Sequence, residues 1–437
     1  MEIKVKPIFI LNKGENAFRY PDGTRDIITD ERTVAQRVTR IRKELRKKLQ
    51  LGPSLLEDAI VTSEEELVSL KNEATQADAL LIYFIGWVPL QRLFTWRLPI
   101  IAFGGLYVPT LPLYALGVEK DTKPDITIAL DYQDIDETLQ VLAAKKKLQN
   151  TQIALFGLPP EMFSRWHHLP DFELAREKLG VRFCSVEIRE VASRLPEIKE
   201  GEAQTLAERW LSEAAKVVEP SKTDIVDAAR VYLILAKLLK EQKANALGIN
   251  CLEFMGSLNI LAPCYALTRL RDEGIPAACE NDIIALLSMM LLGYIADRPA
   301  FMGNTVGAIP EDNILRISHC VVPTKMAGFN QPPQPHTLKN YHGGYRRGVT
   351  AFVEVNTGQE VTMARLSRNL DKIQITNGML TECRDTILCR STFTIKVSDV
   401  RPFVHSAQGN HQSMVLGNCS RQLKTLCNSL GINSIVV

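Results

Sequence analysis

The sequence predicts α/β layers over the first two-thirds of the chain and an all-β unit, either a barrel or a sandwich, in the last third. Short apolar runs alternate with helical patterns up to about residue 298, which is typical of α/β layering. Beyond that point the helical period disappears, and short β patterns separated by turns follow. The length of 437 residues gives room for about two to four domains, at roughly 100–200 residues each.

Three apolar runs in the first third of the chain predict strands. In the second and third of these runs the apolar residues are continuous rather than alternating, which indicates a parallel sheet that is covered on both faces. These runs are residues 4–11, 79–87 and 98–105. Residues 30–50 predict a helix, because apolar residues recur there at steps of three and four. Ser63 and Glu66 have the spacing of a capping box, which predicts the start of another helix.

The middle of the chain predicts a second unit of the same kind. We expect strands at residues 151–160, 181–188 and 244–251, and helices at about 202–217, 222–242, 262–272 and 283–296. The last of these, Ile283 to Ala296, is the longest apolar run, and its 14 residues fall short of the about 20 that span a bilayer. It is therefore expected to be a core helix.

The last third predicts β-strands that are punctuated by turns. The β patterns cover residues 314–322, 348–366, 371–380 and 392–397, and a turn interrupts the second of them at Asn356-Thr357-Gly358. A short helix is expected near residues 418–430.

The composition is that of an ordinary globular protein, with 46% apolar and 23% charged residues. The chain has 52 Lys and Arg residues and 50 Asp and Glu residues, so its net charge is only +2. No overall positive charge therefore attracts nucleic acid or an anionic membrane. Nine cysteines without a C-x-x-C pair argue against a disulfide framework or a thiolate zinc site and favour a reducing compartment. The N-terminal residues do not match a signal peptide, so a cytoplasmic location is expected.

Four motifs of common enzyme classes are absent from the sequence: G-x-G-x-x-G, G-x-x-x-x-G-K-[ST], G-x-S-x-G and H-E-x-x-H. Dinucleotide, P-loop, serine-hydrolase and zincin chemistry therefore have no local support.

Two carboxylates stand where a strand-like segment meets the helix that begins at Ile283. Asp282 directly precedes this helix and has a structural explanation as its N-cap. Glu280 has no such explanation. A side chain at the carboxyl end of an α/β strand points into the crevice where such sheets bind ligands, so Glu280 is the candidate for a functional carboxylate.

Six histidines are candidate ligands, each with a simpler structural explanation. Four lie in polar or in Pro- and Gly-rich segments and are expected at the surface, namely His167, His168, His336 and His342. His319 lies inside a β pattern, where a lone histidine is usually a hydrogen-bonded core group. His411 lies between glycines just before an expected strand. None of the six is a strong candidate by itself.

Four segments in a fixed order resemble the L-fucose isomerase and L-arabinose isomerase superfamily, most closely its fucose-isomerase-like members of uncertain substrate. They are DEGIPAACENDIIALLSMMLL (272–292), RPAFMGN (298–304), ILRISHCVVP (314–323) and GNHQSMVLGNCSRQLKTLCNSLGI (409–432). The resemblance implies two stacked doubly wound α/β domains followed by a C-terminal antiparallel β-barrel domain. The expected domains are 1–148, 149–297 and 298–437, with the site where the second domain meets the barrel.

The resemblance implies an enzyme that interconverts an aldose and a ketose through an enediol and uses Mn²⁺. The first carboxylate ligand of the family falls on Glu280, its final histidine on His411, and a further histidine of the arabinose branch on His319. The second carboxylate ligand falls on Asn304, which departs from the family pattern. An Asn oxygen can coordinate a cation, but it cannot transfer a proton.

The expected metal ligands are therefore Glu280, Asn304, His319 and His411, with Glu280 also the general base. Asp282 or a bound water is expected as the second proton-transfer group. Because of Asn304, another metal-dependent sugar reaction and a sugar-binding protein stay open as alternatives.

The expected partners are a small sugar and further copies of the chain, in a trimer or hexamer where the N-terminal domain of a neighbour closes the cleft. No nucleic acid or membrane partner is expected.

Overall fold

The computed structural model describes residues 2–11, 31–49, 54–84, 88–104, 125–157, 168–344, 347–387 and 389–437. The chain divides into two compact units, Met1–Ala143 and Ala144–Val437, and helix α5 (Tyr132–Gln149) crosses the boundary between them. The division into three domains stays a prediction. The ends of three predicted strands, at 85–87, 105 and 158–160, lie outside the described residues.

The first unit contains a parallel sheet with the strand order β2-β1-β4-β5-β6, and β3 pairs with β1 as well. Its strands are β1 (Lys4–Ile10), β2 (Ser54–Leu55), β3 (Ala59–Val61), β4 (Ala79–Phe84), β5 (Ile100–Phe103) and β6 (Ile126–Ala129). The helices are α1 (Glu31–Lys48), α2 (Glu64–Ser69), α3 (Lys71–Ala74) and η1 (Leu93–Trp96). One apolar cluster joins the sheet to α1, and a second joins it to α2, α3 and η1. Helices therefore cover both faces, as the continuous apolar strands predict.

The second unit begins with another parallel sheet, in the order β11-β10-β7-β8. Its strands are β7 (Gln152–Phe156), β8 (Arg182–Val186), β10 (Ala246–Ile249) and β11 (Ala277–Ala278). The accompanying helices are α7 (Phe172–Leu179), α8 (Ile188–Arg194), η4 (Leu195–Glu197), α9 (Glu200–Glu213), α10 (Lys222–Glu241), α11 (Cys251–Gly256), α12 (Cys264–Asp272) and α13 (Ile283–Ala296). A small separate sheet has the order β15-β14-β9, formed by β9 (Lys216–Val217), β14 (His336–Asn340) and β15 (Val349–Val353).

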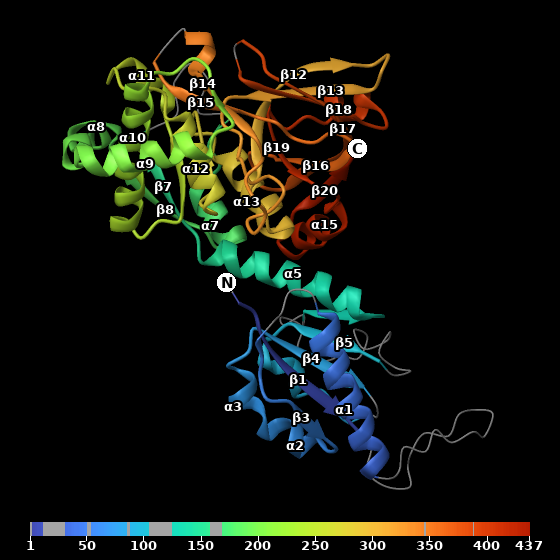
Figure 1. Ribbon diagram of the computed structural model, residues 1–437. Coiled ribbons are helices and arrows are strands. Elements are labelled where there is room, and N and C mark those ends of the chain that lie inside the picture. The colour runs from blue at the N-terminus through green and yellow to red at the C-terminus, as the bar shows by residue number, and fades with distance from the viewer. Residues whose placement is uncertain are drawn as a thin grey trace. The chain divides into compact units, whose positions relative to one another are not determined.

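Six antiparallel strands in the described part of the second unit close into a barrel, in the order β16-β19-β12-β13-β18-β17 and back to β16 (Figure 1). They are β12 (Phe301–Ile309), β13 (Ile314–His319), β16 (Gln359–Leu366), β17 (Lys372–Arg384), β18 (Ser391–Lys396) and β19 (His411–Leu416). A seventh strand, β20 (Asn433–Val436), pairs in parallel with β17, and η5 (Tyr341–Gly344), α14 (Val400–His405) and α15 (Ser420–Ser429) complete the unit. The expected fold class, parallel α/β sheets followed by an antiparallel barrel, is confirmed.

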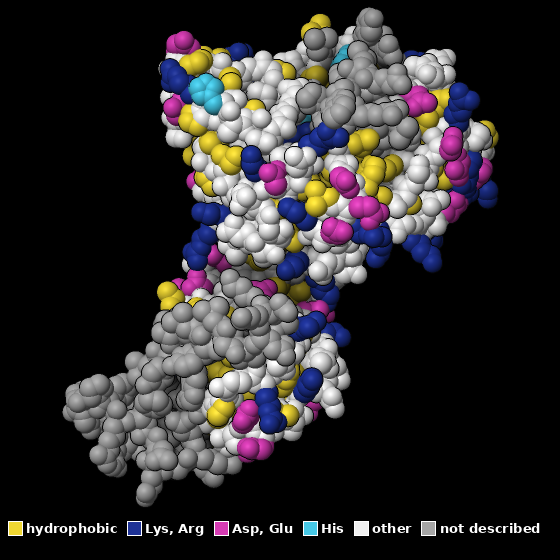
Figure 2. Space-filling view, turned by 180° about the vertical axis from the view of Figure 1, so that it is seen from behind, with side chains coloured by type: hydrophobic (Ala, Val, Ile, Leu, Met, Phe, Trp, Pro, Cys, Tyr) yellow, Lys and Arg dark blue, Asp and Glu magenta, His cyan; other side chains and the backbone are white. Residues whose placement is uncertain are grey.

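Helix α13 links the parallel sheet to the barrel. It follows β11 closely and packs against β16 and β19 of the barrel. Twelve of its fourteen residues are buried, as expected for a helix that is apolar on every side. Among the described residues, no helix combines the length and the apolar character needed to cross a bilayer. On the face shown in Figure 2, basic and acidic side chains are interspersed, in keeping with the balanced composition.

Candidate metal centre

The turn between β11 and α13 presents the two predicted carboxylates. Glu280 and Asn281 both adopt left-handed backbone conformations, with φ of 58° and 50°, which non-glycine residues rarely adopt. The Asn281 side-chain amide holds this turn by donating to the Gly157 carbonyl at 2.6 Å. Gly248 on β10 leaves the space for it, because a Cβ there would lie 2.2 Å from the Asn281 oxygen. Backbone strain of this kind clusters at functional sites.

Glu280 meets two histidines that come from the barrel. Its Oε1 lies 3.8 Å from Nε2 of His319, at the end of β13, and its Oε2 lies 3.7 Å from Nε2 of His411, at the start of β19. One ligand atom from each of the three residues falls within 4.8 Å of the other two. Donors that share one hard cation at about 2 Å lie about 3–4 Å apart, so this spacing fits a divalent ion.

A buried polar atom also indicates that this cluster can hold a cation. Nε2 of His411 is buried and has no hydrogen-bond partner among the described residues. A buried nitrogen without a partner is costly unless a ligand completes it. Glu280, His319 and His411 therefore form a candidate centre of one carboxylate and two imidazoles.

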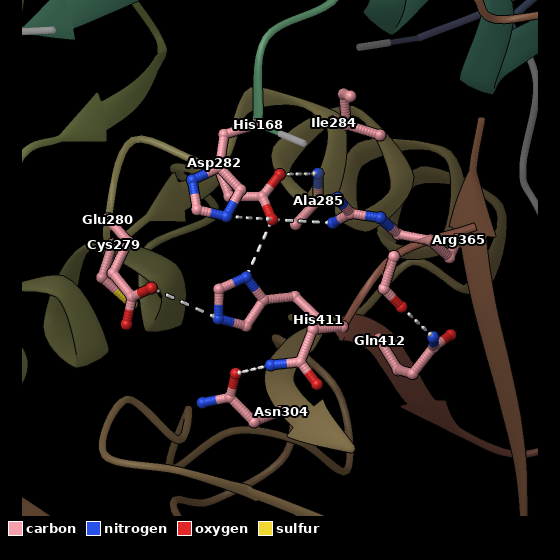
Figure 3. Close-up of polar contacts among 12 residues, drawn as sticks. His168, Cys279, Glu280, Asp282, Ile284, Ala285, Asn304, Arg365, His411 and Gln412 are labelled. Atoms are coloured by element: carbon pink, nitrogen blue, oxygen red, sulfur yellow. Dashed lines mark hydrogen bonds and ion pairs between the residues drawn. The ribbon is translucent and has the colours of Figure 1, made fainter. Parts of the chain in front are cut away.

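Asp282 lies behind this centre and is fully buried (Figure 3). Its Oδ1 accepts from the Ala285 backbone N–H at 2.8 Å, which confirms the predicted N-cap of α13. Its Oδ2 is 2.8 Å from Nδ1 of His411 and accepts from the Arg365 guanidinium at 2.9 Å. With Nδ1 donating to Asp282, the Nε2 lone pair of His411 faces Glu280, which is the tautomer that a metal ligand requires.

The electrostatic surroundings keep both carboxylates ionised. Burial works to raise the pKa of Asp282, but the charge of Arg365 and the hydrogen bond from His411 hold it well below its usual value. Burial likewise works to raise the pKa of Glu280, but the neighbouring imidazoles of His319 and His411 outweigh it, so the pKa is lowered. At neutral pH the site therefore offers a charged carboxylate to a cation or a proton.

Asn304 stands beside the centre without joining the three-residue cluster. It lies opposite His411 in the β12–β19 ladder, and its backbone is therefore adjacent to the site. The side-chain oxygen of Asn304 accepts a hydrogen bond from the Asn410 side-chain amide at 2.5 Å, drawn as a dashed line at Asn304 in Figure 3. To act as a metal ligand, Asn304 would have to give up this bond.

Three of the predictions for surface histidines need correction. His168 is buried, stacks on His411 with ring centroids 5.7 Å apart, and places Nε2 3.7 Å from Oδ2 of Asp282. His336 is also buried, and both of its ring nitrogens have partners. Nε2 lies 3.1 Å from the Tyr265 hydroxyl, and Nδ1 lies 3.2 Å from the Gln334 carbonyl. His342 is half-buried rather than exposed. His167 lies outside the described residues.

Sequence reasoning missed Arg365 and the part that His168 plays. Burial lowers the pKa of His168, against the opposing charge of Asp282, so this imidazole is neutral beside the Asp282–Arg365 pair. Arg365 carries a usable signal, because it is the single charged residue in the buried stretch VTMARL of β16. His168 has none, since the segment RWHHLPD shows no strand or helix period and the contacts of His168 are distant in the chain.

Comparison with known proteins finds sugar isomerases among the relatives of this chain. The chain is 26% identical over 189 residues to a sulfoquinovose isomerase of Alkalicoccus urumqiensis, covering 41% of this chain and 40% of the relative. It is 27% identical over 182 residues to a sulfoquinovose isomerase of Clostridium sp. (strain MSTE9), covering 40% and 38%. It is 25% identical over 171 residues to an L-arabinose isomerase of Serratia proteamaculans (strain 568), covering 38% and 33%.

The chain is related to sugar isomerases of the fucose/arabinose isomerase type. No protein-family model matches it. The matched region spans only about 40% or less of the length of these sugar isomerases, so their activities are not transferred to this chain by similarity alone.

Proposed function

We propose that this chain is a metal-dependent intramolecular oxidoreductase that interconverts an aldose and a ketose through an enediol. The observation that carries the proposal is the buried Nε2 of His411, which has no hydrogen-bond partner in the described part of the chain and lies 3.7 Å from Oε2 of Glu280. His319 is the third member of this cluster. The relatives are isomerases of sugars, which supports the same class of substrate.

Glu280, His319 and His411 would hold the cation, for which Mn²⁺ is the expected species because oxygen and imidazole donors suit it. When bound, such a cation orients the hydroxyl and carbonyl oxygens of the sugar and polarises the carbonyl. The negative charge of Glu280 offsets part of the charge of the cation. The two imidazoles would supply the other donors in their neutral form, because a bound cation displaces the proton from the ligand nitrogen.

In this proposal Glu280 also transfers the proton. As an ionised carboxylate it accepts the C2 proton of the aldose while O1 gains a proton, which gives the enediol. The carboxyl group then returns a proton to C1 while O2 loses one, which gives the ketose. General acid–base help of this kind contributes about 10²–10⁴-fold to the rate.

Asp282 was expected to share this chemistry, and that role stays a prediction. Both of its oxygens are already occupied, by the Ala285 N–H on one side and by His411 and Arg365 on the other. We propose that Asp282 is a positioning residue, which fixes the tautomer and the ring orientation of His411. The proton exchange between O1 and O2 is then left to a bound water.

The test is a panel of aldoses, including sulfoquinovose, L-arabinose and L-fucose, with Mn²⁺ or with a chelator. Ketose formation and exchange of the C2 hydrogen in D₂O are followed by NMR. We expect turnover of at least one aldose with Mn²⁺, and a loss of about 10²–10⁴-fold in Glu280→Gln. The matched control is Glu273→Gln, which removes an exposed carboxylate seven residues earlier and is expected to be neutral.

Asn304 favours one alternative, a protein that binds a sugar without converting it. With a neutral Asn in place of the expected carboxylate, the ligand set has one negative charge fewer. The Asn304 oxygen also accepts a hydrogen bond from Asn410. Saturable sugar binding with no hydrogen exchange from any aldose, in protein shown to contain Mn²⁺, would contradict the isomerase proposal and support this alternative.

The assembly expected from the resemblance, a homotrimer or homohexamer, is part of the proposal. It is tested by sedimentation of the full chain, where a monomer at working concentration would exclude it.

A further inference from the structure

A second cluster of ligand-type side chains lies outside the candidate metal centre. The sulfurs of Cys320 and Cys389 and a ring nitrogen of His342 all fall within 4.8 Å of one another. Cys320 is buried, and Cys389 and His342 are half-buried. The cluster contains no carboxylate, and the proposed isomerase reaction does not use it.

The barrel register brings the two thiols together. Cys320 directly follows His319, the last residue of β13, and Cys389 lies two residues before Ser391, the first residue of β18. His319 and Ser391 are partners in the β13–β18 ladder, so the two cysteines stand at neighbouring strand ends. Ser318 fixes this end of the ladder by donating to the carbonyls of Cys389 and Ser391, at 3.4 and 3.2 Å.

His342 reaches the thiols from a different segment, the short turn η5 that follows β14. Its backbone is left-handed, with φ of 45° and ψ of 50°, a conformation that a residue with a Cβ adopts only when its surroundings enforce it. The ring stacks on Tyr341, with centroids 3.8 Å apart. The imidazole is therefore held in one orientation beside the sulfurs.

We propose that Cys320, His342 and Cys389 form a zinc site. Thiolate and imidazole donors bind Zn²⁺ tetrahedrally, at about 2.3 Å for sulfur and 2.0–2.1 Å for nitrogen, which places the donors roughly 3.3–3.8 Å apart. A cluster within 4.8 Å needs only a small adjustment to reach that spacing. Two thiolates neutralise the charge of the cation, which suits a partly buried place.

The donor set also separates this site from the candidate centre at Glu280. Sulfur ligands favour Zn²⁺, whereas oxygen-rich sets favour Mn²⁺ and Mg²⁺. The fourth position of the tetrahedron is left to water or to Cys264, whose thiol neighbours that of Cys320. The zinc ion would join the turn after β14 to the ends of two barrel strands.

A search of the sequence for C-x-x-C pairs could not find this zinc site. The three ligands come from three separate segments, so no C-x-x-C pair marks them. The expectation that the chain lacks a thiolate zinc site rested on that absence, and it does not apply to ligands that only the tertiary structure brings together.

Co²⁺ is the probe, added to the full-length chain after metal removal and under a reducing agent. We expect a sulfur-to-cobalt charge-transfer band and the strong visible bands of tetrahedral Co²⁺, both saturating at one equivalent and both abolished by added Zn²⁺. The ligands proposed at Glu280, His319 and His411 contain no sulfur, so the charge-transfer band reports on the thiol cluster.

Variants assign the band to its residues. Cys389→Ser and Cys320→Ser are expected to lose the charge-transfer band. Cys383→Ser is the control and is expected to retain the band. Cys383 is a half-buried cysteine of the same barrel whose thiol donates a hydrogen bond to the Val353 carbonyl. Glu280→Gln is expected to keep the band while losing any isomerase activity, so the two proposals can fail separately. The absence of a sulfur band in the wild-type chain, or an undiminished band in folded Cys389→Ser, would overturn the zinc site.

Discussion

Replacing Asp282 by Asn tests how the candidate metal centre is held together. Asp282 and Arg365 form an ion pair at 2.9 Å with each side chain only 1% exposed. Removing one partner of a buried pair costs about 3–5 kcal/mol, because the other charge is left without compensation. Asn has nearly the shape of Asp and caps helices about as well, so neither a cavity nor the loss of the α13 N-cap adds to this cost.

The same substitution is expected to weaken metal binding. Asp282 orients His411 through the 2.8 Å contact at Nδ1, and loss of such a supporting carboxylate typically lowers metal affinity by 10–100-fold. Urea-dependent hydrogen exchange, read on peptides from α13 and β16, measures the stability of this part of the chain. Calorimetric titration with Mn²⁺ measures the affinity.

Asp171→Asn is the matched control, since Asp171 caps α7 through the Leu174 N–H and pairs with no buried Arg in the part of the chain that the structure describes. Its expected change in stability is within about 0.5 kcal/mol. Adding Arg365→Met to Asp282→Asn should recover part of the loss, because the uncompensated buried charge is removed. If Asp282→Asn costs no more than the control and leaves Mn²⁺ affinity unchanged, Asp282 does not hold the centre.

The remaining predictions concern the ligand set, the strained turn and pH. Asn304→Asp adds a negative charge beside His411 and is expected to tighten Mn²⁺ binding in calorimetry, whereas equal or weaker binding would place residue 304 outside the coordination sphere. Gly248→Ala puts a Cβ 2.2 Å from the Asn281 oxygen, so we expect a loss of about 1–3 kcal/mol by denaturant unfolding, together with weaker metal binding. Burial raises the pKa of Asp272 to about 6, although Thr324 and Lys325 hydrogen-bond to it. The folded state therefore holds that proton more tightly than the unfolded state, and stability should fall as pH rises from about 4 to about 6, by at most about 1.4 kcal/mol per pH unit. Asp272→Asn should remove this slope, and a wild-type profile parallel to that of the variant would show that the carboxyl titrates normally.

The elements of the fold could largely be predicted because their signals are local. Strands such as β4 and β10 of the parallel sheets are continuous apolar runs, and α13 is an apolar run of helical length. Strands β12 and β19 were harder to place, since two glycines in the first and polar residues in the second weaken the pattern. Closure of the barrel, rather than a sandwich, depends on the pairings β12–β19, β16–β19 and β13–β18, which join strands far apart in the chain.

The candidate site could be predicted only in part. Glu280, His319 and His411 were chosen through the resemblance, and the structure brings these three together. Asn304 was expected among the ligands, but its hydrogen bond with Asn410 depends on how two neighbouring barrel segments meet. The pairing of His168 and Arg365 with Asp282 was not foreseen, because each comes from a separate segment of the chain.

By itself, the sequence determined where helices and strands form, that Asp282 caps α13, and that Glu280 stands at the end of a parallel strand. These properties depend on apolar period and on hydrogen bonds within a few residues. The tertiary structure decided which side chains meet: the triangle around Glu280, the buried Asp282–Arg365 pair and the thiol cluster at Cys320. Such contacts depend on strand register and barrel closure, because these set the distances between residues far apart in the chain.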